Sequence, residues 1–281
     1  MTKSIKCAII GEMKELRSYT YNWLMRNGRL GNQLWQIAWT YGQAKKVNGQ
    51  ACVLPNWEYR KYVNIPDEMY DGPKFRTVDG ETNYFQELKW WSHCELEVWT
   101  MFQPTQLALK ELTRYAKDIL QTPESCAIHF RYGDYTKYPD HYPLPSDKYY
   151  ISAIQNVLED SPETHFFVFS DDMNLVKKRF NSNPFYLDLV NDNKITLVVG
   201  QPRPVEVVDR VGEPLDWRDM YSISLCNRHI ISNSTFSWWG AYLSATQHPV
   251  MYPSVWYGQH ESVKNIPWKN AIPESWKEIQ V

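Results

Sequence analysis

Short apolar segments alternate with amphipathic segments along most of this chain. From residue 126 onward, strands are expected at 126–131, 166–169, 195–199, 230–232 and 250–252, and the segments between them carry apolar residues at helical spacing. Strands that alternate with helices form a largely parallel sheet with both faces covered. The pattern therefore predicts an α/β fold with a doubly wound sheet.

The first half of the chain repeats this pattern less regularly. Strands are expected at 21–25 and 51–54, joined by a glycine-containing loop at 27–33 and a helix that ends at Gly49. A further helix is expected at 107–120, whereas the aromatic-rich stretch between has no regular period. At 281 residues the chain can form two domains. We expect Rossmann-like domains at 1–121 and 122–281, facing a cleft, with the last helix packing back on the first domain.

Composition limits the classes of partner. The formal net charge is -2, which argues against a general nucleic-acid binder, because such proteins normally carry a basic excess. No run approaches the roughly 18 apolar residues that a membrane helix needs, and no signal-peptide core is recognisable at the N-terminus. A cytoplasmic protein is expected, in contact with a membrane at most peripherally at its inner face.

The five cysteines are scattered and form no C-x-x-C pair, and no H-x-x-x-H pair is present. This spacing gives no sign of a metal site. Cys52, Cys126 and Cys226 lie in or beside apolar segments, so they are expected to be buried thiols.

A first polar cluster follows the expected strand at 126–131. His129 and Arg131 are two residues apart and should point to the same side of the strand. A guanidinium can pair bidentately with a diphosphate, and an imidazole beside it can approach a base. Gly133 lets the chain turn, and Asp134 can orient Arg131. The alternative interpretation is a structural ion pair between Arg131 and Asp134 beside a core histidine.

Two further clusters are more ambiguous taken alone. Asp171 and Asp172 follow the strand at 166–169 and could bind a metal ion, cap the next helix or accept hydrogen bonds from a guanine edge. In the loop at 27–33, Asn32 and Gln33 could bind sugar hydroxyls, and the glycines permit close backbone approach. That loop could also be no more than a turn and a helix start.

The last cluster, HIISNSTFSWWG at 229–240, runs from a strand through small hydroxyl and amide side chains into a helix. Backbone N–H groups and hydroxyls at a helix N-terminus favour a bound phosphate, because the helix dipole attracts negative charge there. Ligands of open α/β sheets bind beyond the carboxyl ends of the strands, and these clusters follow expected strands. The sequence therefore predicts a phosphate-binding site formed by several of them.

Four motifs together resemble those of the bacterial-type α-1,2-fucosyltransferases. They are GRLGNQ at 28–33, HFRYGDY at 129–135, FSDD at 169–172 and NSTFSWW at 233–239, in the family's order over roughly residues 26–256. The resemblance implies a GT-B fold with an acceptor-side N-terminal domain and a C-terminal domain that binds GDP-fucose. It also implies transfer to a glycan hydroxyl, the 2-OH of a galactose, with inversion and without a metal or other cofactor.

The same resemblance assigns the site residue by residue. His129 would contact guanine or ribose, Arg131 the β-phosphate and Asp172 the guanine edge. The diphosphate would be held by Asn233, Ser234, Thr235, Phe236 and Ser237, and the acceptor and sugar side would be lined by Gly31, Asn32 and Gln33. Asp134 is the nearest candidate for the proton acceptor.

One residue departs from the family pattern, because Tyr132 stands where relatives usually carry a second arginine. If the strand keeps its alternation, Tyr132 points away from the side that carries His129 and Arg131. Other interpretations remain open: transfer of another sugar from GDP, a metal-dependent enzyme that uses Asp171 and Asp172, or a carbohydrate-binding protein without activity.

Overall fold

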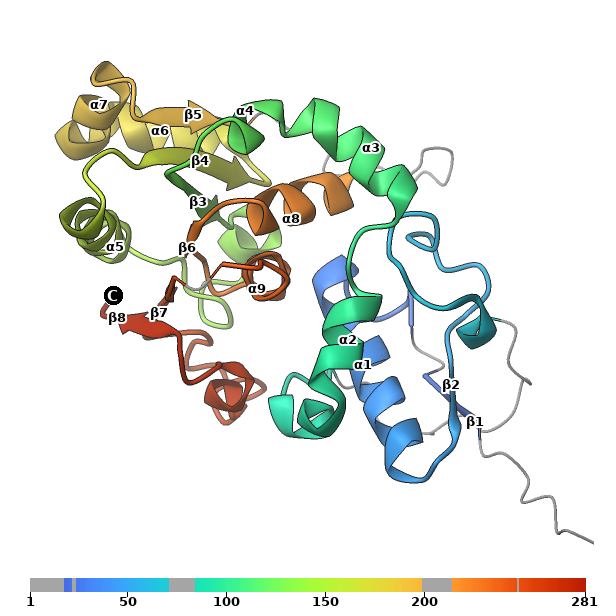
Figure 1. The fold of residues 1–281 in the computed structure, drawn as a ribbon. Helices are drawn as coiled ribbons and strands as arrows, with labels where there is room; N and C mark the ends of the chain where they lie inside the picture. The colour runs from blue at the N-terminus through green and yellow to red at the C-terminus, as the bar shows by residue number, and fades with distance from the viewer. Residues whose placement is uncertain (1–17, 22–23, 71–83, 199–213, 247) are drawn as a thin grey trace, which may run out of the picture.

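The computed structural model describes residues 18–21, 24–70, 84–198, 214–246 and 248–281 (Figure 1). Its larger sheet has six parallel strands in the order β5-β4-β3-β6-β7-β8. The strands are β3 (Ser125–Phe130), β4 (His165–Ser170), β5 (Ile195–Leu197), β6 (Arg228–Ile230), β7 (Val250–Pro253) and β8 (Lys277–Ile279). The expected doubly wound α/β sheet is therefore present.

This strand order has a reversal at its centre. The chain runs outward from β3 through β4 to β5, then returns to β6 and runs outward the other way through β7 to β8. The two connections that leave β3 and β6 diverge, so a crevice opens beyond the carboxyl ends of these two neighbouring strands. The predicted phosphate-binding motifs follow directly after β3 and β6.

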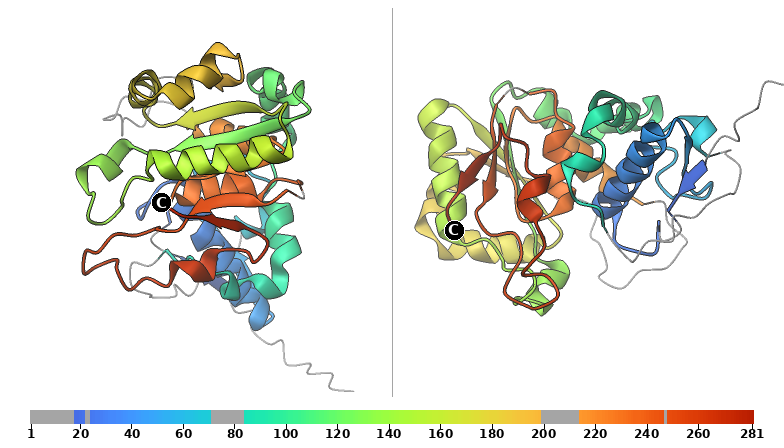
Figure 2. Two further views of the ribbon diagram at one scale, coloured as in Figure 1. Left: turned by 90° about the vertical axis from the view of Figure 1, so that its left-hand side faces the viewer. Right: turned by 90° about the horizontal axis from the view of Figure 1, so that it is seen from below.

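Helices cover both faces of this sheet, as Figure 2 shows. The buried side chains of α5, α6 and α7 pack against Cys126, Ile128 and Phe130, whereas those of α4 (Lys117–Leu120) and α8 pack against Ala127 on the other face. The helices of this half are α5 (Asp147–Asp160), α6 (Met173–Ser182), α7 (Pro184–Asn191), α8 (Asp216–Ser224) and α9 (Thr235–Tyr242). The Ser146 hydroxyl caps α5 by accepting from the Tyr149 N–H.

The N-terminal half has a smaller described sheet. Strand β1 (Ser18–Thr20) pairs in parallel with β2 (Gln50–Cys52), and α1 (Leu30–Lys46) connects them. The other helices here are α2 (Glu95–Met101), α3 (Gln106–Tyr115) and α4 (Lys117–Leu120). Short 3-10 turns lie at η1 (Asp67–Met69), η2 (Leu88–Trp90), η3 (Ser92–Cys94), η4 (Gly133–Lys137) and η5 (Trp268–Ala271).

Several expected boundaries were wrong. The first strand precedes 21–25, where the Leu24 N–H donates to the Tyr21 carbonyl and Met25 has a φ of 70°, so the chain turns there; residues 22 and 23 lie outside the described part. The helix expected at 107–120 is interrupted at Ala116, whose φ of -105° and ψ of 27° are not helical. Residues 30–33, expected in a loop, belong to the first turn of α1.

The end of the chain also differs from the expectation. It closes with β8 rather than a helix, and the part that contacts the N-terminal half is the preceding turn η5, where the Asn270 side-chain amide donates to Glu87 at 2.7 Å. The predicted boundary at 121–122 lies on the connection between α4 and β3.

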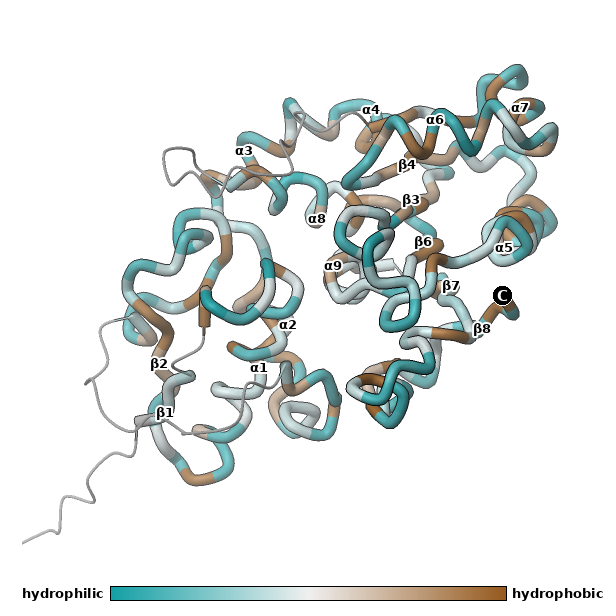
Figure 3. Tube along the Cα trace, turned by 180° about the vertical axis from the view of Figure 1, so that it is seen from behind, coloured by the Kyte–Doolittle hydropathy of each residue, from teal (hydrophilic) through white to brown (hydrophobic). Residues whose placement is uncertain are grey.

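One hydrophobic core joins the two halves. Trp35 of α1 packs against Trp238 and Trp239 of α9, with ring centroids 4.5 Å and 5.3 Å away, and Trp91 packs on Trp239. Figure 3 shows mainly hydrophobic residues along the central strand β3. Cys52, Cys94, Cys126 and Cys226 are buried thiols, and Cys7 lies outside the described residues. Among the described helices, none is long and apolar enough to cross a membrane.

Candidate active site

A polar pocket lies beyond the carboxyl ends of β3 and β6, between the N-termini of α1 and α9. Most of the predicted site residues line it: Gly31, Asn32, His129, Arg131, Asp134, Ser234, Thr235 and Phe236. Four predicted residues do not: Gln33, Asp172, Asn233 and Ser237. The pocket therefore brings together parts of the motifs from both halves of the chain.

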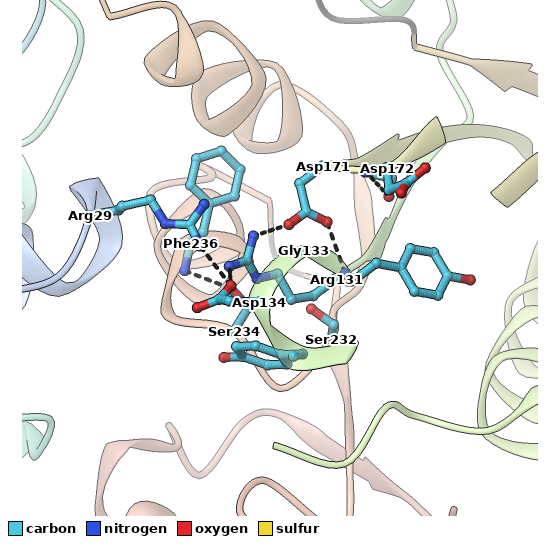
Figure 4. A network of polar contacts seen from close by, with 12 residues as sticks. Arg29, Arg131, Gly133, Asp134, Asp171, Asp172, Ser232, Ser234 and Phe236 are labelled. Carbon is cyan, nitrogen blue, oxygen red and sulfur yellow. Dashed lines mark hydrogen bonds and ion pairs between the residues drawn. The ribbon is translucent and has the colours of Figure 1, made fainter. Parts of the chain in front are cut away.

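Arg131 lies between two carboxylates at the floor of the pocket (Figure 4). Its Nη1 pairs with Asp171 and its Nη2 with Asp134. Phe130, the last residue of β3, is in register with Ser170, the last residue of β4, so Arg131 and Asp171 leave neighbouring strands side by side. Gly133 has a φ of 30°, and a side chain there would collide with the Asp171 carboxylate and crowd Arg131. Glycine is thus required for this arrangement.

His129 is buried at the inner end of the pocket. Its Nδ1 shares a 2.8 Å hydrogen bond with the Ser232 hydroxyl, which follows β6. The Tyr150 hydroxyl donates to the His129 carbonyl at 3.0 Å, so both the ring and the backbone of this residue are held. The imidazole and the guanidinium of Arg131 face the same pocket, as the strand alternation predicted.

The N-terminus of α9 forms one wall. Ser234 is its cap residue, and its hydroxyl accepts from the Phe236 N–H at 3.3 Å. The Asn233 amide instead anchors two loops by donating to the Pro143 and Trp256 carbonyls, each at 2.9 Å. The Ser237 hydroxyl is buried and donates to the Ser234 carbonyl at 3.3 Å. Asn233 and Ser237 therefore do not line the pocket but stabilise the backbone of this wall.

The N-terminus of α1 packs directly on this wall. A Cβ at Gly31 would lie 2.6 Å from the Phe236 nitrogen, so glycine allows two helix backbones to touch. The Asn32 Oδ1 accepts from the Thr235 hydroxyl at 2.8 Å. Gln33 points away from the pocket, where its Oε1 accepts from the Trp57 indole at 2.7 Å. The glycine in this motif therefore permits the backbones of α1 and α9 to approach each other closely.

The two aspartates after β4 have separate roles. Asp172 caps α6, because its Oδ1 accepts from the Asn174 and Leu175 N–H groups at 3.1 Å and 3.0 Å. Asp171 faces the pocket, where its other contact is the Tyr132 N–H at 2.8 Å. Both carboxylates thus accept from protein donors. No group of three or more potential metal-ligating His, Cys, Asp or Glu side chains is found among the described residues.

Sequence reasoning did not single out the aromatic wall of the pocket. Tyr84, Tyr142, Trp256 and Tyr257 line the pocket there, and the Tyr257 hydroxyl donates to Gln86 at 2.9 Å. Burial raises the pKa of the Tyr84, Tyr142 and Tyr257 hydroxyls, so these groups stay neutral. Tyr84 comes from a stretch with no readable period, and Tyr142, Trp256 and Tyr257 come from loops, where no pattern shows which way a side chain points.

The two halves of the chain meet over a pocket at the switch point of the larger sheet, an arrangement typical of GT-B glycosyltransferases. The sequence profile of Glycosyl transferase family 11 matches residues 43–184 and 203–276, and the chain belongs to this family. It is therefore a glycosyltransferase, and its resemblance to the fucosyltransferases is confirmed.

Individual relatives agree with this assignment. An alpha-1,2-colitosyltransferase of Escherichia coli is 26% identical over 95% of this chain and 88% of its own length. A galactoside 2-alpha-L-fucosyltransferase of Caenorhabditis elegans is 28% identical over 73% of this chain and 53% of its own length. A solved structure of an Arabidopsis thaliana FUT1 mutant in complex with GDP superposes with a TM-score of 0.51 at 14% identity, covering 85% of this chain and 70% of that one. This structural likeness concerns the fold alone.

Proposed function

We propose that this protein transfers fucose from GDP-fucose to the 2-OH of a galactose in a glycan acceptor, with inversion and without a metal ion. The observation that carries the proposal is the placement of Arg131 beside the N-terminus of α9 at the switch point of the sheet. A guanidinium and a helix N-terminus together form a site for a diphosphate. The family membership and the fucosyltransferase among the relatives support fucose as the sugar.

Arg131 and α9 would act mainly on the leaving group. As the bond between the fucose anomeric carbon and the β-phosphate oxygen breaks, GDP takes the electron pair and negative charge grows on that phosphate. A preorganised guanidinium and helix N–H groups stabilise this charge where a metal ion would otherwise be needed. His129, held by Ser232 at 2.8 Å, would contact the guanine or the ribose.

Asp134 is the proposed proton acceptor for the attacking hydroxyl. The acceptor oxygen forms the new bond to the anomeric carbon, and its proton passes to a carboxylate at the mouth of the pocket. Both ion pairs of Asp134 use Oδ1, and the side chain is half exposed, so an acceptor glycan can approach it. The aromatic wall of Tyr84, Tyr142 and Tyr257 would then offer ring faces to the acceptor sugar.

A second candidate is transfer of colitose through the same site. The relative named a colitosyltransferase aligns over 88% of its length, compared with 53% for the fucosyltransferase of Caenorhabditis elegans. The pocket contacts that we assign to the donor are contacts to the diphosphate and base, which two GDP-sugars share. Direct comparison of the two sugar donors with one galactoside acceptor separates these candidates.

We expect GDP to bind in the presence of EDTA and GMP to bind much more weakly, because Arg131 and α9 contact the diphosphate directly. Isothermal calorimetry with both nucleotides measures this difference. GDP release from GDP-fucose that depends on an added galactoside would then demonstrate transfer. Loss of GDP binding in EDTA with recovery in Mn²⁺ would favour the metal-dependent alternative, and GDP-fucose binding without turnover on any glycan of an array would favour a binding protein.

A further inference from the structure

We propose that Arg29 is a second phosphate-binding residue of the donor site, supplied across the pocket by the N-terminal half of the chain. The inference rests on the proposed function, because it assumes that a nucleoside diphosphate binds beside Arg131. Relatives usually carry a second arginine at position 132, where this chain has Tyr132. We infer that Arg29 supplies the second positive charge instead.

The first observation is that two guanidinium groups converge on one oxygen atom. Arg29 Nη2 lies 2.8 Å from Asp134 Oδ1, and Arg131 Nη2 pairs with the same Oδ1 (Figure 4). The two arginines are far apart in the sequence, yet their charged ends meet at a single point in the pocket. An anion at this point contacts both.

The second observation is that the side chain of Tyr132 does not reach the pocket and cannot contact a phosphate there. Its ring is buried with Phe130 on the opposite face of the sheet, and Arg179 Nη1 donates to its hydroxyl at 3.4 Å. Among the described residues that line the pocket, Arg29 and Arg131 are the side chains with a permanent positive charge. The second charge at the mouth of the pocket is therefore that of Arg29.

The third observation concerns the helix that carries Arg29. This residue is the N-cap of α1, which has 17 residues, no capping side chain and no acidic residue in its first turn. The positive end of the α1 dipole is thus not offset by its own helix. Gly31 and Asn32 hold this end against Thr235 and Phe236, so the N-termini of α1 and α9 lie together at the pocket.

Exposure indicates which contact a diphosphate would replace. The side chains of Arg29 and Asp134 are 57% and 49% exposed, whereas those of Arg131 and Asp171 are both 10% exposed. The outer pair can separate without unpacking the core, while the inner pair keeps Arg131 oriented. A diphosphate would then displace the Asp134 carboxylate from both guanidinium groups and leave that carboxylate beside the sugar as proton acceptor.

Calorimetry with GDP and GMP in EDTA tests the proposal on Arg29→Ala, Arg29→Lys and Arg26→Ala. Arg26 is an exposed arginine three residues earlier that does not line the pocket, so it controls for the change in net charge. We expect Arg29→Ala to weaken GDP binding by about tenfold to a hundredfold, the range for a hydrogen bond to a charged group. GMP binding should stay within about twofold, Arg29→Lys should recover part of the loss, and Arg26→Ala should bind GDP as the wild type does.

Two outcomes would overturn the proposal. Equal GDP affinity in Arg29→Ala and Arg26→Ala would show that Arg29 does not contact the diphosphate. Equal losses for GDP and GMP, with a lowered melting temperature and no recovery in Arg29→Lys, would make Arg29 a structural link between the halves. A wild-type protein that does not distinguish GDP from GMP would instead overturn the proposed function itself, so the two failures are distinguishable.

Discussion

Arg131 is held by two carboxylates in a geometry that only a planar guanidinium can satisfy. One side of the fork pairs with Asp171 and the other with Asp134, and the guanidinium lies 5.0 Å from the centre of the Tyr135 ring. A lysine keeps the charge but offers one ammonium group on a flexible stem, so it cannot stay paired with Asp171 and bind a phosphate bidentately in the same way.

We therefore expect Arg131→Lys to lower kcat by roughly a hundredfold or more. Loss of one contact to charge that develops in the transition state costs about 3–4 kcal/mol. Steady-state assays with GDP-fucose and saturating acceptor measure the effect, and circular dichroism checks that the variant is folded. A folded variant with kcat within about threefold of wild type would contradict the phosphate role of Arg131.

The sequence predicted that Tyr132 points away from the pocket, and the structure confirms it. Replacement by arginine would place a second guanidinium beside Arg179 in the buried layer with Phe130. Burying a like charge without a new partner is costly, so we expect Tyr132→Arg to lower the melting temperature while the KM for GDP-fucose changes only a few-fold. Tyr132→Phe is the control, because it keeps the ring and removes only the hydroxyl.

A titration of GDP-fucose at saturating acceptor tests whether an arginine at position 132 reaches the phosphates. A gain of more than about tenfold in apparent affinity, equivalent to about 1.4 kcal/mol, would mean that the new arginine reaches the phosphates from position 132. The face assigned to Tyr132 would then be wrong.

At the scale of single residues, the sequence could not say which of two adjacent carboxylates faces the ligand. Asp171 and Asp172 both follow the end of β4 at Ser170, just as Arg131 follows the end of β3 at Phe130, so strand alternation alone does not say which carboxylate faces the ligand. The cap by Asp172 depends on where α6 begins, and the contact of Asp171 depends on the register of β3 with β4. The ion pair between Arg29 and Asp134 joins distant segments, and no local pattern encodes it.

At the scale of elements, long runs with a clear period were predicted well. The central strands β3, β4 and β6 and the helices between them lie where the alternation of apolar residues placed them, within a few residues. Strand β8 was missed because Lys277, Glu278 and Ile279 form no apolar run, and Ile279 alone of these three is buried in this edge strand. The apolar residues Tyr21 and Leu24 of the run at 21–25 are buried, but in a turn rather than in a strand.

The contact between α1 and α9 depends on one glycine. We expect Gly31→Ala to destabilise the protein by about 1–3 kcal/mol, although alanine normally favours a helix, because the new methyl group meets the backbone of Thr235 and Phe236. Displacing α1 also moves Arg29 and should weaken GDP binding. Urea unfolding and calorimetry measure the two effects.

Asn32→Ala is the matched comparison in the same helical turn. It removes the two hydrogen bonds that Asn32 Oδ1 accepts from Thr235 and Gln86 but adds no atom between the helices, so we expect a cost of about 1–2 kcal/mol. A Gly31→Ala protein as stable as the wild type would show that the two helices can separate freely, and the placement of Arg29 would lose its support.

At the scale of the whole molecule, the two halves share their largest core. Trp35, Trp91, Trp238 and Trp239 form one cluster of rings with contributions from both sides of the predicted boundary at 121–122. Each half of the chain has its own sheet, but the two halves share one hydrophobic core. The pocket lies on the same seam, so the elements that bind the donor are also the elements that hold the halves together.

We therefore expect the intact chain to unfold in urea as one cooperative transition, with coincident curves from tryptophan fluorescence and far-ultraviolet circular dichroism. The segment 122–281 expressed alone would expose Trp238 and Trp239, whose loss of packing is comparable with removing large core side chains, at about 3–5 kcal/mol each. It should show no cooperative transition, whereas co-expression with the segment 1–121 should restore one. If the isolated segment unfolded at the midpoint of the intact chain, the halves would be independent domains, and the shared core would not couple them.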